Sequence, residues 1–286
     1  MNRVRNTWKR IVRMVGMSRQ LQMGLILFAL VLLVVIFAPA IAPFDPYYLG
    51  NDLLVGPWVN GHLLGTTNMG QDLFSMLIYG SRASLAIGIV AAAISGLIGT
   101  LIGAVAGYYG GAVDRTISEI INIFLMIPSF FMTLIIVALF GSSMVNVMLV
   151  IGLTSWPSNA RMMRVQAMSI KERTFVKSAT CMGESRPQIL FKYIIPNGLF
   201  PIIANTTMGV AKAILTEASL SFLGLGDPNV VSWGQMIYDG KQYLTSGWWM
   251  SAFAGIFIMV IVMIFYMLGD GLNHVLNPKH ISGGKK

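Results

Sequence analysis

Charged side chains are scarce in this 286-residue sequence, at 11% of all residues, against roughly 25% in soluble proteins. With 55% hydrophobic residues, the chain has too few polar groups to cover a water-soluble surface, which excludes an ordinary soluble domain. The single cysteine, Cys181, excludes an intrachain disulfide, and we interpret it as a small packing residue.

The sequence also lacks the motifs of an enzyme or of a self-sufficient pump. The phosphate-loop pattern G-x-x-x-x-G-K-[ST] does not occur, which excludes ATP hydrolysis by that route. The three histidines, His62, His274 and His280, are scattered and form no H-E-x-x-H pattern or cluster with cysteine, so a metal site has no support. We therefore expect no catalytic residue, no metal and no cofactor bound by this chain.

Long uncharged hydrophobic runs are what the sequence has instead. A helix needs about 20 apolar residues to cross the roughly 30 Å hydrocarbon core of a bilayer, and lipid forces a spanning segment to satisfy its backbone hydrogen bonds internally. The run 120–160 is too long for one crossing, and Gly141-Ser142-Ser143 indicates a turn that splits it. Six spans are thus expected, at 21–42, 83–113, both halves of 120–160, 197–217 and 248–268. The predicted fold class is an all-α polytopic membrane protein with six transmembrane helices.

Basic residues indicate how these spans are oriented. Most of the 20 lysines and arginines lie in the tail 1–20, the loop 161–196 and the tail 271–286, whereas only Arg82 and Lys241 fall on the other face. The positive-inside rule places both termini and the loop 161–196 in the cytoplasm. The net charge of +9 is therefore a topology signal, and we expect no nucleic-acid partner.

The expected organisation follows from these spans. Apolar residues at helical spacing in the basic tail, such as Trp8, Ile11 and Val15, predict a helix along the cytoplasmic membrane surface. The first hydrophobic run exceeds the 7–15 residues of a signal peptide, so we expect an uncleaved helix. The predicted regions are a tail at 1–20, the first transmembrane helix at 21–43, an extracytoplasmic loop at 44–82, a five-helix core at 83–270 that includes the cytoplasmic loop 161–196, and a tail at 271–286.

Small and polar residues inside the spans are candidates for packing and transport. Glycines recur at three- or four-residue spacing in the second span, at Gly96, Gly99, Gly103 and Gly107, which predicts close helix contact. Ionisable residues in spans commonly mark a transport path, and Lys212 and Glu217 are the candidates. Five residues correspond to roughly 140° around a helix, so these two are not expected to pair.

We assign Asn205, Lys212, Glu217 and Ser219 to a translocation path. The alternative for Lys212 and Glu217 is a structural hydrogen bond at the membrane rim.

The cytoplasmic loop 161–196 carries a distinct local pattern. Phe175, Val176, Ala179 and Met182 recur at helical spacing and predict a short amphipathic helix. Gly183 suits a left-handed C-terminal cap. Ser185-Arg186-Pro187-Gln188 then predicts a capping box that starts a second helix. The loop is expected to form a helix–turn–helix with a short apolar knob, which could pack on the membrane surface or on a protein partner.

The spacing in this loop resembles a known signature. Residues 175–183 followed by Pro196-Asn197 are similar to the E-A-A-x-x-x-G…P signature of ABC importer permeases. Lys177 stands where the signature has an acidic residue, Ser178 replaces its first alanine, and Tyr193 stands where the peptide and nickel branch usually has histidine. The resemblance implies a coupling helix that seats in a groove of an ATPase subunit. The residues that it assigns to this role are Phe175, Val176, Lys177, Ser178, Ala179, Met182, Gly183 and Pro196.

Two further blocks point to one branch of that family. Residues 61–75, continuing into 79–85, resemble the H-P-L-G-T-D-x-x-G-R-D block of dipeptide, oligopeptide and nickel permeases, with Thr67 and Gln71 in place of its Asp and Arg. Residues 217–226 and Ser232-Trp233-Gly234 look almost unaltered. Together the likeness covers nearly the whole chain and is greatest to the second, shorter permease of the pair.

The resemblance implies a type I ABC importer permease fold, a bacterial inner-membrane location and a set of partners. These are a homologous permease, two ABC ATPase subunits that carry ATP and Mg, an extracytoplasmic solute-binding protein and membrane lipid. In the loop 44–82 it suggests a docking surface for the binding protein, and the candidate residues are Asp45, Tyr47, Asp52, Trp58 and Asp72.

The cargo expected from this branch is peptide, with nickel or a metal–chelator complex as the alternative. A rival from another class is an ATP-independent secondary transporter or channel, which predicts several charged residues at the membrane midplane. A membrane-embedded enzyme is a third class, and it lacks a paired nucleophile, base or set of metal ligands in this sequence.

Overall fold

The computed structural model describes residues 18–276. The surface helix predicted in the tail 1–20 and most of the tail 271–286 lie outside these residues. Throughout the part that is described the regular structure is helical, and no strand forms there beyond two isolated bridges, Val59 with His62 and Thr66 with Asp72. The predicted all-α class is therefore confirmed for this part of the chain.

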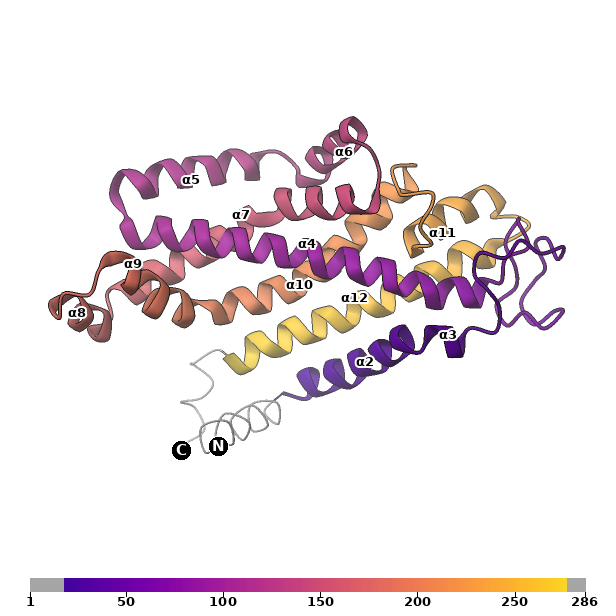
Figure 1. Cartoon of the computed structure of the whole chain (residues 1–286), viewed down its shortest axis with the longest axis horizontal. Helices are drawn as coiled ribbons and strands as arrows, with labels where there is room; N and C mark the ends of the chain where they lie inside the picture. Colours follow the sequence, from indigo (N-terminus) through magenta and orange to yellow (C-terminus); the bar gives the residue numbers. More distant parts are fainter. Residues whose placement is uncertain (1–17, 277–286) are drawn as a thin grey trace.

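Five long helices run along the long axis of the molecule (Figure 1). They are α2 (Arg19–Ile36), α4 (Leu73–Tyr109), α7 (Met144–Lys171), α10 (Ile195–Phe222) and α12 (Trp248–Leu276). The short elements gather mainly at the two ends. They are α3 (Ala38–Ile41), α8 (Thr174–Cys181), α9 (Arg186–Ile189), the π-helical turn η1 (Leu190–Ile194), α11 (Trp233–Gly240) and the 3₁₀ turn η2 (Lys241–Tyr243). The loop 42–72 and α8 therefore lie at opposite ends of the bundle (Figure 1).

The third span is broken in two. Helices α5 (Gly111–Met126) and α6 (Ser129–Phe140) meet at an angle of 82°. Pro128 lies at the break, and a proline forces the residue before it out of the helical region; Ile127 is indeed extended, with φ −84° and ψ 125°. The sequence pattern predicted the turn at Gly141 but not this bend at Pro128.

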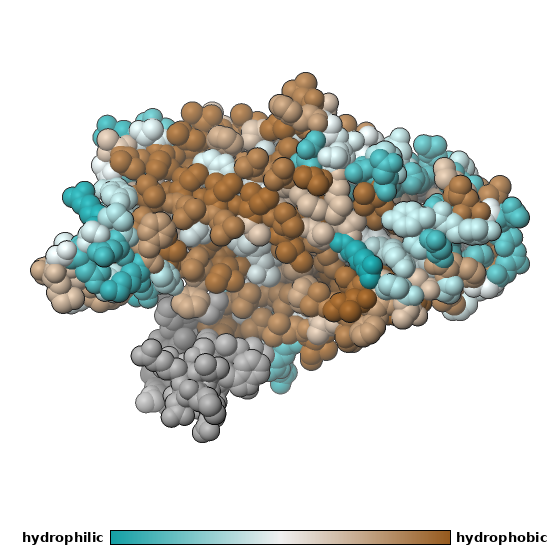
Figure 2. Space-filling view, in the orientation of Figure 1, coloured by the Kyte–Doolittle hydropathy of each residue, from teal (hydrophilic) through white to brown (hydrophobic). Residues whose placement is uncertain are grey.

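Four helical stretches within residues 18–276 are long and apolar enough to cross a membrane, and the bent α5–α6 pair makes a fifth. The four are α2, α4, the continuous helical stretch Arg186–Phe222 and α12. Figure 2 shows a broad apolar band around the middle of the visible face, with polar residues concentrated towards its two ends. Helix α7 has 28 residues, but Arg161 and Arg164 lie in its second half, so the sixth crossing stays a prediction.

Several predicted boundaries differ from the structure, among them the start of the second span and the end of the sixth. Helix α4 begins at Leu73 rather than at residue 83, because Asp72 caps it: the Ser75 N–H donates to Asp72 Oδ2 at 2.8 Å. The end of the predicted extracytoplasmic loop is thus helical. Helix α12 continues past residue 270 to Leu276.

Glycines bring α4 and α7 into direct backbone contact, as their spacing predicted. A Cβ atom on Gly99 would lie only 2.8 Å from the Trp156 carbonyl oxygen, and one on Gly103 would overlap the carbonyl of Ala160. A Cβ atom on Gly107 would likewise overlap the backbone carbonyl oxygen of Arg164. We call this contact the α4–α7 seam. The two backbones are so close there that no residue larger than glycine fits between them. Gly96, one turn away, faces α10 instead.

Substitution within the α4–α7 seam tests this packing. Gly103→Ala forces a methyl group against the Ala160 carbonyl and the Met163 Cβ atom of α7, neither of which is the flexible end of a side chain. Overpacking of this kind costs about 1–3 kcal/mol. We expect a lower Tm of the purified protein in detergent. Gly255→Ala in α12 is the matched control because its added methyl meets nothing within 4 Å. A Gly103→Ala protein that melts at the wild-type temperature would contradict the seam.

Candidate functional site

Helix α8 has one anchored face and one exposed face. Val176 and Ala179 are 2% and 1% exposed, and they share a cluster with the C-terminal ends of α4 and α7, which contribute Tyr108, Ala167 and Ile170. On the other face, Phe175 is 39% and Met182 is 74% exposed. The predicted amphipathic helix is confirmed. Its open face carries the polar residues Lys177, Ser178 and Thr180 beside Phe175, and Met182 adds an exposed apolar side chain at the end of the helix.

A glycine turn ends α8 as the sequence predicted. Gly183 has φ +82°, a conformation that favours glycine. Its N–H donates to the Thr180 carbonyl at 3.1 Å, and the Glu184 N–H donates to the Ala179 carbonyl at 3.2 Å, which is the paired hydrogen-bond pattern of a left-handed helix cap. An added Cβ would meet nothing within 4 Å. The requirement for glycine is therefore one of backbone angle and not of space.

The helix after the turn starts with the predicted capping residues. Gln188 Oε1 accepts hydrogen bonds from the Ser185 N–H at 3.0 Å and from the Ser185 hydroxyl at 2.9 Å. The chain then runs through α9 and η1 into α10. The wide π turn η1 precedes Pro196, whose ring would otherwise collide with the carbonyl four residues back. Pro196 itself is exposed.

Ion pairs surround this turn. Lys177 Nζ lies 3.0 Å from Glu172 Oε2, and Lys192 Nζ lies 3.0 Å from Glu184 Oε1. The hydrogen bond from Lys192, and then that from the Tyr193 hydroxyl at 2.8 Å, lowers the pKa of the Glu184 carboxyl. Lys177 likewise lowers the pKa of Glu172. Lys177, which stands where the family signature has an acid, is thus neutralised by a neighbour on the same loop.

A second cluster of polar residues lies inside the helix bundle. The Asn205 side-chain amide donates to Asn159 Oδ1 at 2.8 Å, and the Asn159 amide donates to Ser95 Oγ at 3.1 Å. These bonds join α10, α7 and α4. A shallow pocket next to them is lined by Ser155, Ser158, Thr206 and Lys212. The structure therefore brings Asn205 and Lys212 together at one pocket. Ser95 and Asn159 line the same pocket, but no charge or motif distinguished these two residues in the sequence.

Glu217 and Ser219 do not lie in that pocket. Glu217 is 4% exposed, and its Oε1 accepts hydrogen bonds from the Ser221 hydroxyl at 2.8 Å and the Ser232 hydroxyl at 3.0 Å. It joins α10 to the start of α11, so its assignment to an open path is corrected to the alternative, a structural hydrogen bond. Ser219 lines a separate apolar hollow with Phe130 and Ile258, and its hydroxyl donates to the Leu215 carbonyl.

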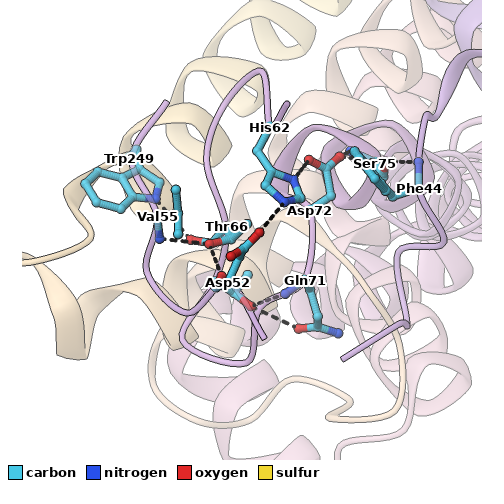
Figure 3. A network of polar contacts seen from close by, with 10 residues as sticks. Phe44, Asp52, Val55, His62, Thr66, Gln71, Asp72, Ser75 and Trp249 are labelled. Atoms are coloured by element: carbon cyan, nitrogen blue, oxygen red, sulfur yellow. Dashed lines mark hydrogen bonds and ion pairs between the residues drawn. The ribbon is translucent and has the colours of Figure 1, made fainter. Parts of the chain in front are cut away.

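The loop 42–72 is tied down by a polar network (Figure 3). His62 Nδ1 lies 2.8 Å from Asp72 Oδ1, and Asp72 Oδ2 accepts from the Ser75 hydroxyl at 2.7 Å. The Thr66 hydroxyl donates to the Asp52 carbonyl at 2.6 Å, and the Trp249 indole N–H, from α12, donates to the Thr66 carbonyl at 3.1 Å. The loop is thereby held as a fixed cap over the end of the bundle.

The predicted docking residues divide between the surface and the inside of this cap. Tyr47 is 57% and Trp58 is 78% exposed, Asp45 is also exposed, and the Asp52 side chain is 46% exposed. Asp72 is only 2% exposed. Its assignment to the docking surface is corrected, because its carboxylate is used to cap α4 and to hold His62.

Known proteins resemble this chain over most of its length. Residues 99–281 match the family model "Binding-protein-dependent transport system inner membrane component", and residues 6–66 match "N-terminal TM domain of oligopeptide transport permease C". The dipeptide transport system permease protein DppC of Alkalihalophilus pseudofirmus is 36% identical over 95% of this chain and 90% of its own length. The protein of that name from Haemophilus influenzae is 37% identical over 92% of this chain and 91% of its own length.

The fold has a counterpart among solved structures. A chain from the MetNI methionine ABC transporter in an inward-facing conformation aligns with a TM-score of 0.57 and 21% sequence identity, over 72% of this chain and 98% of that chain. An identity this low speaks for the fold alone. Together with the helices described above, the likeness confirms the predicted type I ABC importer permease fold.

Asp72 offers a test of the capped loop. Asp72→Ala removes the N-cap of α4, at a cost of about 0.5–2 kcal/mol, and leaves His62 without its carboxylate. We expect faster amide hydrogen exchange across residues 44–72 in the purified protein. Asp72→Ser keeps a capping oxygen and should recover part of the protection. Asp45→Ala, at an exposed site, removes only the acceptor of the Tyr47 N–H and should leave the rest of the loop unchanged. Wild-type exchange rates in Asp72→Ala would refute the role given to this carboxylate.

Proposed function

Because the chain belongs to the family of binding-protein-dependent transport system inner membrane components, as the permease subunit of an ABC importer, we propose that it forms half of a membrane path for peptides. In this proposal a homologous permease forms the other half, and two ATPase subunits bind ATP and Mg on the cytoplasmic side. An extracytoplasmic solute-binding protein delivers the cargo. The chain itself binds no cofactor and catalyses no reaction.

The observation that carries the proposal is the two-sided packing of α8. Its inner face is buried in a cluster with residues of α4, α7, α9 and η1, while Phe175 and Met182 are exposed apolar side chains on the outside. A partner that seats on this surface would bury two large apolar side chains. Through Val176 and Ala179 it would also push on the α4–α7 seam, so α8 and the seam move as one body when the ATPase subunits close.

The orientation follows from the basic residues. The cytoplasmic loop 161–196 holds α8, and the start of α2 and the end of α12 both point towards the end of the bundle that carries α8 (Figure 1). We therefore propose that both termini and α8 face the cytoplasm, and that the capped loop 42–72 faces outward in the bacterial inner membrane. This arrangement agrees with the positive-inside rule.

Peptide is the cargo that the relatives favour. Both relatives described above are named for dipeptide transport. Nickel and metal–chelator complexes, the alternatives suggested by the family resemblance, have no observation in their favour in the described part of the chain. A secondary transporter would leave the exposed apolar side chains of α8 without a use.

The extracytoplasmic cap is the proposed docking surface for the solute-binding protein. Trp58 is 78% exposed and holds a backbone φ of +66°, which is unfavourable for an aromatic residue. Its N–H donates to the His62 carbonyl at 2.9 Å, so the tied loop presents the indole outward. Tyr47, Asp45 and Asp52 complete the proposed surface.

A substitution in the α8 turn tests coupling. Gly183→Val places a β-branched residue at φ +82°, which distorts the turn while adding no clash. We expect the complex to assemble in the membrane and to lose its substrate-stimulated ATP hydrolysis, measured in proteoliposomes. Gly183→Asn is the matched control, because asparagine tolerates this conformation, and it should keep much of the stimulation. Wild-type stimulation in Gly183→Val would reject the coupling role.

A second substitution tests docking. Buried tryptophans at interfaces commonly contribute 2 kcal/mol or more to binding, so Trp58→Ala should raise about thirtyfold the concentration of binding protein that gives half-maximal stimulation of ATP hydrolysis. Trp248→Ala is the control, because Trp248 is 53% exposed at the start of the last span and outside the proposed surface. An equal effect of both substitutions would argue against docking through Trp58.

A further inference from the structure

Lys212 lies on a polar stripe that runs along one face of α10. Asn205, Gly209 and Lys212 are spaced at i, i+4 and i+7, which places them on one helix face, and all three line the shallow pocket between α10, α7 and α4. Helix α7 supplies Ser155 and Ser158 to the same pocket. The stripe is therefore part of a surface made by three helices.

The ammonium of Lys212 has no partner in the described part of the chain. No carboxylate between residues 18 and 276 lies within ion-pair distance of it, and its Nζ makes no hydrogen bond there. The nearest acid along the helix, Glu217, is rotated by roughly 140° and is already bonded to Ser221 and Ser232. Lys212 is nevertheless exposed.

The direction of the helix keeps this charge inside the membrane region. Side chains on an α-helix lean towards its N-terminus, and α10 runs outward from the cytoplasmic loop. Lys212 thus leans back over Gly209 and Asn205, consistent with the lining of the pocket, and away from the nearer membrane surface. An unpaired charge at this depth is expected to face a water-filled cavity and not lipid.

The other polar groups around this charge are neutral, and the rest of the pocket lining is apolar, from residues such as Ala91, Ile151 and Ala213. Ser155, Ser158, Asn205 and Thr206 bring hydroxyl and amide groups, and Lys212 is the one charged residue among those that line the pocket. A single ammonium beside neutral donors is the donor set that suits a carboxylate. The same charge repels a free divalent cation.

We propose that Lys212 binds the carboxylate of the peptide during its passage, and that the path therefore favours cargo with a free carboxylate over neutral or cationic cargo. This inference rests on the proposed function, since it names a specificity site within the same path. Asn205, held by Asn159, and the two serines of α7 position the carboxylate beside the ammonium.

Uptake of two peptides that differ only at the C-terminus tests the proposal. The importer, with all its subunits, is reconstituted in vesicles, and the uptake of trialanine and of its C-terminal amide is measured with the binding protein saturated by each peptide. We expect the wild type to take up trialanine about tenfold faster, the effect of one hydrogen-bonded charge pair. Lys212→Met should lower trialanine uptake to about the rate of the amide, and Lys212→Arg, which keeps the charge, should retain the preference.

The remaining outcomes distinguish a failure of the Lys212 proposal from a failure of the proposed function. Assembly of each variant is checked by the ratio of its subunits after purification. If Lys212→Met retains the wild-type preference, or slows both peptides equally, the charge acts elsewhere, for example against the homologous permease, and the inference is overturned alone. If the wild type takes up neither peptide, the proposed function is overturned together with it.

Discussion

The structure depends on the close approach of α4 and α7. Gly99, Gly103 and Gly107 leave no room for a side chain between the two backbones, so the helices meet as rigid surfaces. In a bilayer, where apolar side chains gain little by leaving lipid for protein, contact of this kind is a main source of helix association. The three sites described above lie at the ends and along the edge of this seam.

The α4–α7 seam positions three sites. At one end of the seam, Val176 and Ala179 of α8 lie in the same buried cluster as Tyr108 of α4 and Ala167 of α7. Along its edge, Ser95 of α4 and Asn159 of α7 hold Asn205 of α10 and so shape the pocket beside Lys212. At the other end, Asp72 caps α4 and holds the loop that presents Trp58. One packed pair of helices thus connects α8, the polar pocket beside Lys212 and the capped loop 42–72.

Sequence patterns predicted the features that depend on neighbouring residues. They did not predict the features that depend on residues far away along the chain. Hydropathy predicted the four long apolar helices and the α5–α6 region, and glycine spacing predicted the seam. The Gly183 cap and the Gln188 hydrogen bonds followed from short-range chemistry. The roles of Asp72 and Glu217 were misjudged, because an acidic residue in a loop or a span looks the same whether it faces water or a buried hydroxyl. His62 and Ser232, which decide those cases, are ten and fifteen residues away. Pro128 alone could have predicted the bend between α5 and α6. It lies within a charge-free hydrophobic run, however, and that run suggested an unbroken helix up to Gly141.

The central claim is that α8 moves together with the α4–α7 seam as one body. It is tested most directly by the distance between spin labels on the native Cys181 of α8 and on a cysteine at Met168 of α7, both exposed. The measurement is made in the assembled importer with and without bound ATP, on a labelled complex that retains stimulated ATP hydrolysis. The account predicts the same distance in both states. A distance that changes on ATP binding would show that α8 swings independently of the helices beneath it and would contradict the account.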